Sequence, residues 1–346
     1  MKYINHFERR RKTMINNNYY PIKRLVTFSV PFIIVLVAVV FNYSVLAENF
    51  PTKEIELIIN FGPGGSTDMM ARIVGDKVSK HLGVPFIYSN KPGGGGAIAT
   101  NYIINSKPDG YTIGTGGASN LGTLLATSAG GKIPYSLKDI SGIARAVIVP
   151  LVVVTKKGRF ENFESLVKEA KQKPGMIMFG SWGSKSTSHI MGELINQVTG
   201  IKMKHIPFDS GAKSLVAVLG GHIDIAISTP STSLSNLRAG TITALAVTSP
   251  NRLDDIRGVP TLKELGYPEA TFTSYDGFIT SSKVPKERLA ILQVAFEKSL
   301  KDIEVQEALK KAGMVPAFLS GKDYEAFLES NLEMLKEVAI KAGIKD

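Results

Sequence analysis

Three short loops rich in glycine and hydroxyl residues are the places where this sequence could bind a small anion. They are Gly62–Thr67, Ser181–Thr187 and Pro207–Gly211, and a segment with helical spacing of apolar residues follows each loop. The first N–H groups of a helix have no partner within it and carry partial positive charge, so they attract anions. Serine and threonine hydroxyls add donors, and glycine lets the backbone approach a ligand closely. If the three loops converge on one cleft, they would hold a carboxylate without an arginine.

The same residues also have a purely structural interpretation. Ser66, Thr67 and Asp68 are residue types that cap helices, and glycines simply allow the chain to turn. His189 stands at the start of an apolar helix, where a capping or packing role is more common than catalysis. Trp182 is either a core or hinge residue or, since it lies in a polar loop, a residue that stacks on a ligand at the mouth of a cleft. The sequence leaves both interpretations open.

Signals of catalysis and of metal binding are weak. The sixth position of Gly62–Thr67 is threonine, which breaks the spacing of the dinucleotide-binding fingerprint, and neither a Walker A sequence nor a nucleophile elbow occurs. Cysteine is absent, which excludes disulfides and thiolate sites. No two of the histidines have the helical spacing of metal ligands; they are His6, His81, His189, His205 and His222. Four aspartates could act as catalytic carboxylates, but nothing in the sequence pairs them; they are Asp68, Asp209, Asp224 and Asp276. We therefore expect no enzyme, no cofactor and no metal site.

Residues 1–47 have the pattern of a signal peptide. Basic residues at positions 9–12 and 23–24 precede the uncharged run Leu25–Phe41, and small residues end at Ala47, a plausible cleavage site. The pattern predicts export to the periplasm. The uncharged run approaches the length of a membrane-spanning helix, so an uncleaved anchor is the alternative, and Met14 is an alternative start.

The high net charge of +11 comes largely from this leader. Residues 1–47 hold seven of the 41 basic residues and one of the 30 acidic ones, which leaves 34 against 29, a net charge of +5, for residues 48–346. Such a mild excess without a block of like charges is typical of a solvated surface, so we expect no nucleic-acid binding. At 346 residues, of which 44% are hydrophobic, the chain can bury a sizeable core and form two lobes.

The mature chain alternates strand and helix patterns, which is typical of an α/β layered fold with a mostly parallel sheet. In the first part we predict strands at 55–61, 86–89 and 111–114 and helices at 67–81 and 97–106. In the middle we predict strands at 149–155, 176–180, 204–207, 223–228 and 245–248, with helices at 163–171, 190–198 and 214–219. The tail from 285 to 346 is predicted to be helical, notably at 289–300 and 324–342, and to return to the first part. The expected division is residues 48–148 with 250–346 as lobe 1 and residues 149–249 as lobe 2.

Short motifs spread over nearly the whole mature length resemble the substrate-binding proteins of tripartite tricarboxylate transporters, the Bug or TctC type. Each motif is weak alone, whereas their order and spacing together are specific. The matching stretches are Phe61–Asp68, Asn90–Gly96, Pro108–Thr112, Leu219–Gly221, Ala244–Ser249 with Arg252, Val259–Thr261, Gly266–Pro268 and Lys341–Lys345.

The resemblance implies an α/β, two-lobed type II periplasmic-binding-protein fold, in which each lobe is a mostly parallel sheet flanked by helices and the cleft lies between the lobes. It implies a protein that is not an enzyme and that captures a small mono-, di- or tricarboxylate for the membrane subunits of a tripartite tricarboxylate-type transporter. We expect it to be a monomer. A ligand-sensing subunit for a membrane receptor and an enzyme on the same fold are the alternatives.

The resemblance also implies which residues bind the ligand, and two departures from the family pattern accompany them. The implied residues are Phe61, Gly62, Gly64, Gly65, Thr67, Asp68, Ser119, Asn120, Ser181, Ser186, Thr187, His189, Phe208, Asp209, Gly211, Ser228, Thr229 and Tyr275. Lys185 stands where the family usually has a small residue, and Trp182 enlarges the same loop. We therefore expect a different preference for ligand size or charge, with Lys185 pairing with a second carboxylate.

Overall fold

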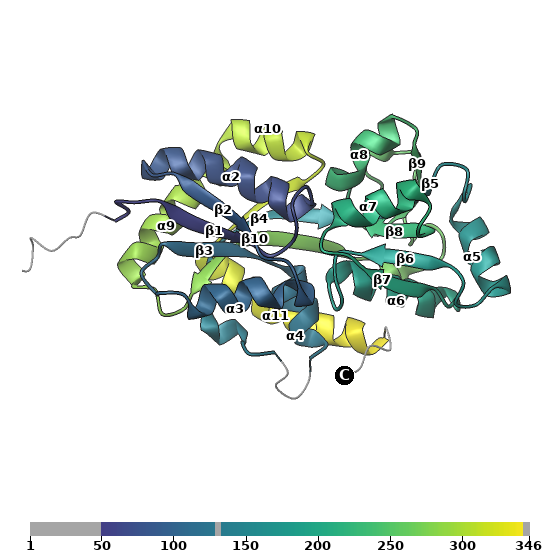
Figure 1. Cartoon of the computed structure of the whole chain (residues 1–346), viewed down its shortest axis with the longest axis horizontal. Coiled ribbons are helices and arrows are strands. Elements are labelled where there is room, and N and C mark those ends of the chain that lie inside the picture. Colours follow the sequence, from purple (N-terminus) through teal and green to yellow (C-terminus); the bar gives the residue numbers. More distant parts are fainter. Residues whose placement is uncertain (1–49, 129–132, 342–346) are drawn as a thin grey trace, which may run out of the picture. The chain divides into compact units, whose positions relative to one another are not determined.

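The computed structural model describes residues 50–128 and 133–341. The predicted leader, its cleavage site, the alternative start at Met14 and most of the closing motif lie outside the described residues. From Pro51 onward the chain forms one compact unit, which contains two β-sheets with their flanking helices (Figure 1).

The first sheet has six strands in the order β11-β4-β10-β3-β1-β2. β1 pairs with β2 and β3 in parallel, whereas β10 runs antiparallel to β3 and β4, and β11 antiparallel to β4. Burial of almost every β1 side chain explains why this strand reads as a continuous apolar run. The strands are β1 (Ile55–Ile59), β2 (Phe86–Asn90), β3 (Thr112–Gly117), β4 (Ile140–Pro150), β10 (Thr273–Ser281) and β11 (Val315–Ser320).

Helices from both ends of the described chain cover this sheet. α2, α9 and α10 pack on one another, and Figure 1 shows α3 and α11 on the opposite side of the sheet from α2. The helices are α2 (Ser66–Leu82), α3 (Ala97–Asn105), α4 (Leu124–Ala126), α9 (Lys286–Lys301), α10 (Ile303–Lys311) and α11 (Gly321–Lys341). Short turns are η1 (Gly94–Gly96), the π-helical turn η2 (Ala118–Thr123) and η4 (Leu137–Asp139).

The second sheet has five strands in the order β7-β6-β8-β5-β9. β6 pairs with β7 and β8 in parallel, and β5 lies antiparallel between β8 and β9. Its strands are β5 (Val152–Lys156), β6 (Met178–Ser181), β7 (Lys204–Pro207), β8 (Ile225–Ser228) and β9 (Ile242–Val247). The accompanying helices are α5 (Phe163–Gln172), α6 (Thr187–Thr199), α7 (Gly211–Gly220) and α8 (Pro230–Arg238), and the turns η5 (Asp254–Ile256) and η6 (Pro268–Ala270) follow β9.

The chain crosses between the sheets twice, and Thr248 ties the two crossings together. The first crossing joins β4 to β5 at Leu151, and the second runs from β9 to β10. Thr248 N donates to Leu151 O (3.0 Å), Thr248 Oγ1 donates to Phe272 O (2.6 Å), and Phe272 N donates to Thr248 O (2.7 Å). A few residues at element ends that join two sheets in this way are the arrangement of a hinge.

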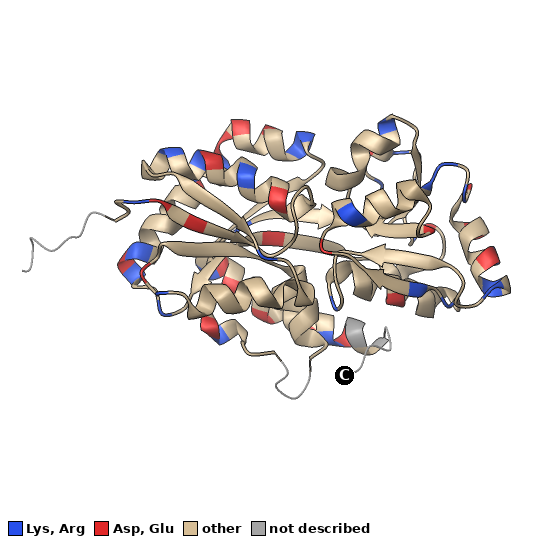
Figure 2. Ribbon diagram, viewed as in Figure 1, with Lys and Arg blue, Asp and Glu red and all other residues tan. Residues whose placement is uncertain are grey.

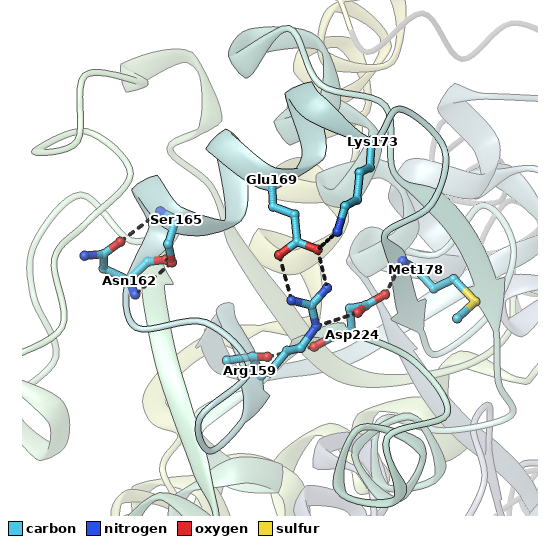
Figure 3. A network of polar contacts seen from close by, with 8 residues as sticks. Arg159, Asn162, Ser165, Glu169, Lys173, Met178 and Asp224 are labelled. Atoms are coloured by element: carbon cyan, nitrogen blue, oxygen red, sulfur yellow. Dashed lines mark hydrogen bonds and ion pairs between the residues drawn. The ribbon is translucent and has the colours of Figure 1, made fainter.

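A network of ion pairs fixes α5 to the second sheet (Figure 3). Arg159 binds both oxygens of Glu169 (2.8 and 3.0 Å) and donates from Nε to Asp224 (2.9 Å). Asp224 also accepts from Met178 N (2.8 Å), and Lys173 reaches Glu169 (3.2 Å). Every carboxylate of this network therefore has a cation and hydrogen-bond donors as partners.

The predicted two-lobed α/β fold is confirmed, and Figure 2 shows charges of both signs interspersed mainly over the helices. The expectation that each sheet is mostly parallel is wrong in detail, because both sheets are mixed. Alternation of strands and helices predicts parallel pairs, but β10 and β11 in the first sheet and β5 in the second run against the direction of the other strands. β4, β10, β11 and α8 were not predicted, since glycine within β10 and proline within β11 weaken the strand pattern.

Candidate functional site

A pocket lies between loops of the two sheets and contains about 430 Å³ of empty space, its solvent-open part included. Elements of the first sheet supply Phe61, Gly65, Ser66, Thr67, Ser119, Val149, Ser274 and Asp276, and elements of the second supply Trp182, Gly211, Thr229 and Thr232. Serine and threonine hydroxyls thus form much of the lining, and none of these lining residues is a lysine, arginine or histidine.

Three helices begin at the pocket. Ser66 and Thr67 open α2, Gly211 opens α7, and Thr229 caps α8. The cap of α2 is Gly65, which makes no side-chain capping bond, whereas Thr229 accepts from Thr232 N. Helix N-termini present N–H donors and partial positive charge, so this wall of the pocket is suited to an anion.

The glycine loop between β1 and α2 is held in shape by Asp68. Its carboxylate accepts from Gly64 N (3.0 Å), from Arg72 (3.1 Å) and from Asn90 (3.0 Å). Burial alone would raise the pKa of Asp68, but these hydrogen bonds and the Arg72 charge outweigh it, and the pKa lies below its usual value. Gly62 N also donates to Asp209 O (2.9 Å), which joins this loop to the one before α7.

Ser119 connects the pocket wall to the loop before α6. Its hydroxyl lies 3.2 Å from Trp182 Nε1, 3.0 Å from Thr187 Oγ1 and 3.2 Å from Thr187 N. Trp182 is only 9% exposed, so it is a buried wall of the pocket. The donors that surround Ser119 hold elements of both sheets together directly beside the pocket.

Two stacked histidines support the Ser181–Thr187 loop from behind. The rings of His189 and His205 lie 3.7 Å apart, His189 Nδ1 accepts from Lys185 N (2.9 Å), and Ser181 Oγ lies 2.6 Å from His205 Nε2. Burial, together with the His189 ring, lowers the pKa of His205 to about 4, although Glu193 acts in the opposite direction. His205 is therefore neutral at physiological pH, which keeps the stack and the loop intact.

Lys185 is directed away from the pocket. Its Nζ donates to Thr127 O (3.1 Å) beyond the end of α4, and Thr123 Oγ1 donates to its carbonyl oxygen (3.0 Å). Its φ of 60° is in the left-handed region, which a lysine adopts only at an energetic cost. The geometry therefore does not support pairing of Lys185 with a carboxylate in the pocket.

Asp276 is the acidic residue of the pocket lining. It lies on β10 at a register irregularity, and Thr67 Oγ1 donates to its Oδ2 (3.1 Å). The carboxyl is deep among protein atoms yet retains partial solvent contact through the pocket. Burial raises the pKa of Asp276 to about 7, and the Thr67 hydrogen bond offsets this only in part.

Comparison with known proteins identifies the family. The sequence profile described as "Tripartite tricarboxylate transporter family receptor" (TctC) matches residues 70–344. The chain belongs to the TctC receptor family. Among its relatives, Protein BugT of Bordetella pertussis is 29% identical over 303 residues, which cover 87% of this chain and 93% of BugT.

Solved structures of similar proteins agree with this assignment. "Structure of a periplasmic transporter" superposes with a TM-score of 0.81 and 30% identity and covers 86% of this chain and 99% of that one. "R. palustris Rpa4515 with adipate" has a TM-score of 0.81 and 27% identity over the same shares. TctC receptors are solute-binding proteins and not enzymes, so this chain is a solute-binding receptor. Within the described residues, no helix has the length and apolar character needed to span a membrane.

Only part of the residue set implied by the TctC resemblance lines the pocket. The lining contains Phe61, Gly65, Thr67, Ser119, Gly211 and Thr229. Others hold the lining in place: Gly62, Gly64, Asp68, Ser181, Ser186, Thr187, His189 and Asp209 shape the three loops, and Asn120 fixes the end of β3 through Gly117 N (2.9 Å).

Three implied residues face elsewhere. Tyr275 is buried on the opposite face of β10 from Ser274 and Asp276, as strand alternation requires, and packs against Phe327 with ring centroids 4.8 Å apart. Phe208 packs on the core of the second sheet, and Ser228 accepts from Ser233 Oγ (2.8 Å).

The pocket of this TctC receptor also contains residues absent from the implied set. They are Ser66, Val149, Trp182, Thr232, Ser274 and Asp276. Trp182 and Asp276 stood out in the sequence by residue type, and strand alternation around Tyr275 would have indicated Ser274 and Asp276 had β10 been predicted. Val149 carries no signal, because an apolar strand residue is more often core.

Proposed function

We propose that this receptor captures a small carboxylate in the pocket outside the cytoplasmic membrane and delivers it to the membrane subunits of a tripartite tricarboxylate-type transporter. The observation that carries the proposal is the convergence of three helix N-termini and several hydroxyls on a pocket lined by no basic side chain. Such a wall binds an anion through N–H and O–H donors. The relative Rpa4515, whose structure is titled as containing adipate, supports the carboxylate class.

The proposal includes how the chain is organised for this task. Residues 1–47 would be a cleaved leader that directs the protein to the periplasm. Residues 48–148 with 250–346 would form lobe 1 and residues 149–249 lobe 2, and the lobes would close around the ligand about the crossings at Leu151 and Thr248. The receptor would act as a monomer.

The proposed residues of the site act in two ways. Those that line the pocket bind the ligand, and those that shape the loops keep donors oriented toward it. Thr187 belongs to the second group because its contact with Ser119 joins the two sheets beside the pocket. We expect loss of a loop-shaping residue to lower the affinity for all ligands by the same factor. Loss of a lining residue should instead change which ligand is preferred.

A thermal-melt screen of the secreted protein tests this function. The panel contains mono-, di- and tricarboxylates, amino acids and aromatic acids, with neutral sugars as the control class. A ligand present at 100 times its Kd stabilises the native state by about 2.7 kcal/mol, which raises the melting temperature visibly. A selective rise with one class of acid is expected. Protein that is folded and free of carried-over ligand, yet responds to no carboxylate, would contradict the proposal.

A further inference from the structure

Asp276 lacks a countercharge in the pocket that it lines. Of its polar neighbours, Thr67 Oγ1 is the group within hydrogen-bond distance of the carboxylate, at 3.1 Å. No basic side chain is among the lining residues. An ionised carboxylate that is removed from bulk water is costly unless a cation or several donors compensate it. An empty pocket with such an acid is therefore electrostatically incomplete.

The fold makes room for this carboxylate. Asp276 lies opposite Gly117 of β3 at a register irregularity of β10. A Cβ added at Gly117 would collide with Asp276 Oδ1 and with Tyr275 O. φ at Gly117 is −165°, an extended value that any residue adopts, so the glycine is required for space and not for its conformational freedom. The carboxyl group thus occupies a prepared position.

The charged groups near Asp276 on neighbouring elements do not compensate it. Arg145 of β4 lies on the other face of the sheet, where its guanidinium covers the Phe327 ring at 4.7 Å and donates to Ala317 O (2.9 Å). Tyr275 and Tyr324 are buried phenols on that same face, and the negative charge of Asp276 contributes to raising their pKa. A cation for Asp276 has to come from the pocket side.

We propose that Asp276 makes the receptor selective for small acids that carry an ammonium group beside the carboxylate, the chemistry of amino acids. The inference rests on the proposed function, because the helix N-termini hold the carboxylate while Asp276 binds the ammonium group. A hydroxyl would form the hydrogen bond but leave the charge uncompensated, and a second carboxylate would repel Asp276. Ser66 Oγ, buried in the same lining without a hydrogen-bond partner among the described residues, is a further acceptor for an N–H donor.

Matched ligand sets isolate the ammonium group. Aspartate, malate and succinate share a carbon skeleton and differ at one carbon, as do alanine, lactate and propionate. Calorimetry of the secreted protein with both sets should give the ammonium member an affinity about tenfold or more above its hydroxy and unsubstituted partners. Equal or tighter binding of the hydroxy or unsubstituted acid in both sets would overturn the proposal.

Two variants separate a specific role from a structural one. Asp276→Asn keeps the shape and the Thr67 contact but removes the charge, so the preference for the ammonium member should fall to within about twofold while the unsubstituted acid binds as well as before or better. Asp76→Asn removes one exposed negative charge from α2, the helix that carries Thr67, and should leave the preference intact. If Asp276→Asn lowers the affinity for all ligands by the same factor, the residue only supports the fold.

The pH dependence of ligand affinity has opposite signs for the two ways in which Asp276 could bind a ligand, as an ionised or as a protonated carboxyl group. Ionised Asp276 paired with ammonium predicts tighter binding of aspartate or alanine as pH rises from 6 to 8, because the pKa of Asp276 in the empty pocket is about 7. A protonated Asp276 that donates to a second carboxylate predicts weaker binding over the same range, and that result would refute the ammonium assignment. If neither set nor any other carboxylate binds, the proposed function itself fails, which is a different outcome.

Discussion

Two groups of carboxylates in this molecule have opposite surroundings. Glu169 lies on α5 and Asp224 directly before β8, with Arg159 between them, and each makes short hydrogen bonds to that guanidinium (Figure 3). Asp276 lies in the pocket, and Thr67 is its one hydrogen-bonded neighbour among the described residues. Arg159, acting through its hydrogen bonds, lowers the pKa of Glu169 to about 2, whereas burial raises the pKa of Asp276 to about 7.

This difference in pairing distinguishes a carboxylate with a structural role from one that is available to bind a ligand. A carboxylate whose charge is neutralised within the fold contributes to stability and has no capacity left for a ligand. A carboxylate without a cation costs stability in the empty protein, and that cost is removed when a suitable ligand arrives. Residue type alone does not distinguish Asp224 from Asp276, since the distinction lies in the neighbours.

Filling the space that Gly117 leaves for the Asp276 carboxyl group should have the largest effect on stability and ligand binding. Gly117→Ala places a methyl group against Asp276 Oδ1 and the Tyr275 backbone oxygen, so either the carboxyl or the sheet must move. We expect a loss of about 3 kcal/mol of unfolding free energy and loss of ligand binding. Urea unfolding with calorimetry measures both. Gly258→Ala, at a position with no atom within 4 Å of the added Cβ, is the control, and equal behaviour of the two variants would contradict the close packing at Gly117.

Removing Arg159 should turn the paired acids into unpaired ones. Arg159→Met leaves Glu169 and Asp224 without their shared cation, and we expect a loss of about 2 kcal/mol, discounted because the network is partly exposed. Ligand affinity should not change, because Arg159 does not line the pocket. Lys173→Met is the matched control: its side chain is 60% exposed, so its loss should cost less than about 0.5 kcal/mol. Similar losses in both variants, measured by urea unfolding, would argue against the importance of the Arg159 geometry.

The pH dependence of stability should distinguish the two kinds of acid in sign. The pKa of Asp276 is about 7 in the folded protein and 3.8 in the reference state, so the folded state binds the proton more tightly. Its contribution to stability is therefore present below pH 3.8 and is lost as pH rises to about 7. Glu169 behaves oppositely: its contribution is present above pH 4.5 and is lost as pH falls toward about 2.

Asp276→Asn makes this sign measurable. Because asparagine does not titrate, the variant should gain stability relative to the native protein as pH rises from 4 to 7, by on the order of 1–2 kcal/mol. Ligand-free protein unfolded in urea at several pH values gives the difference. A constant difference across this range would show that Asp276 is not an uncompensated acid. Glu169→Gln should show no such gain between pH 5 and 7.

The sequence predicted the elements built from local pattern and missed those defined by their neighbours. β1, α2 and the helices α5, α6 and α7 follow apolar periodicity with clear stop signals, and their positions agree with the prediction to within a few residues. β10 was missed because its core residues alternate with Ser274 and Asp276, and glycine interrupts it. Both pocket residues of this strand were lost with it, since only the strand shows which side chains share a face.

The candidate site was predicted at the level of loops and not of contacts. The three glycine- and hydroxyl-bearing loops do meet at the pocket: α2 and α7 begin there, and the Ser181–Thr187 loop contributes Trp182 to the lining. Which loop residues face inward could not be predicted, as His189 and Ser181 show: both support the loop from behind. Such orientation depends on distant partners, here His205, whose position in the sequence carries no signal.

Lys185 should show the smallest effect and the sharpest contrast with Asp276, because it is a charge beside the cleft that does not face the ligand. Its side chain and its carbonyl oxygen bind Thr127 and Thr123 across the two sheets, so Lys185→Ala should weaken closure and reduce the affinity for every ligand by about threefold. The ratio between aspartate and succinate should stay constant. Lys185→Gly loses the same contact but relieves the left-handed φ of 60°, so it should be about 1 kcal/mol more stable to unfolding than Lys185→Ala. A selective loss of dicarboxylate binding in Lys185→Ala would mean that the lysine reaches the ligand, and it would assign to Lys185 the charge recognition that we place at Asp276.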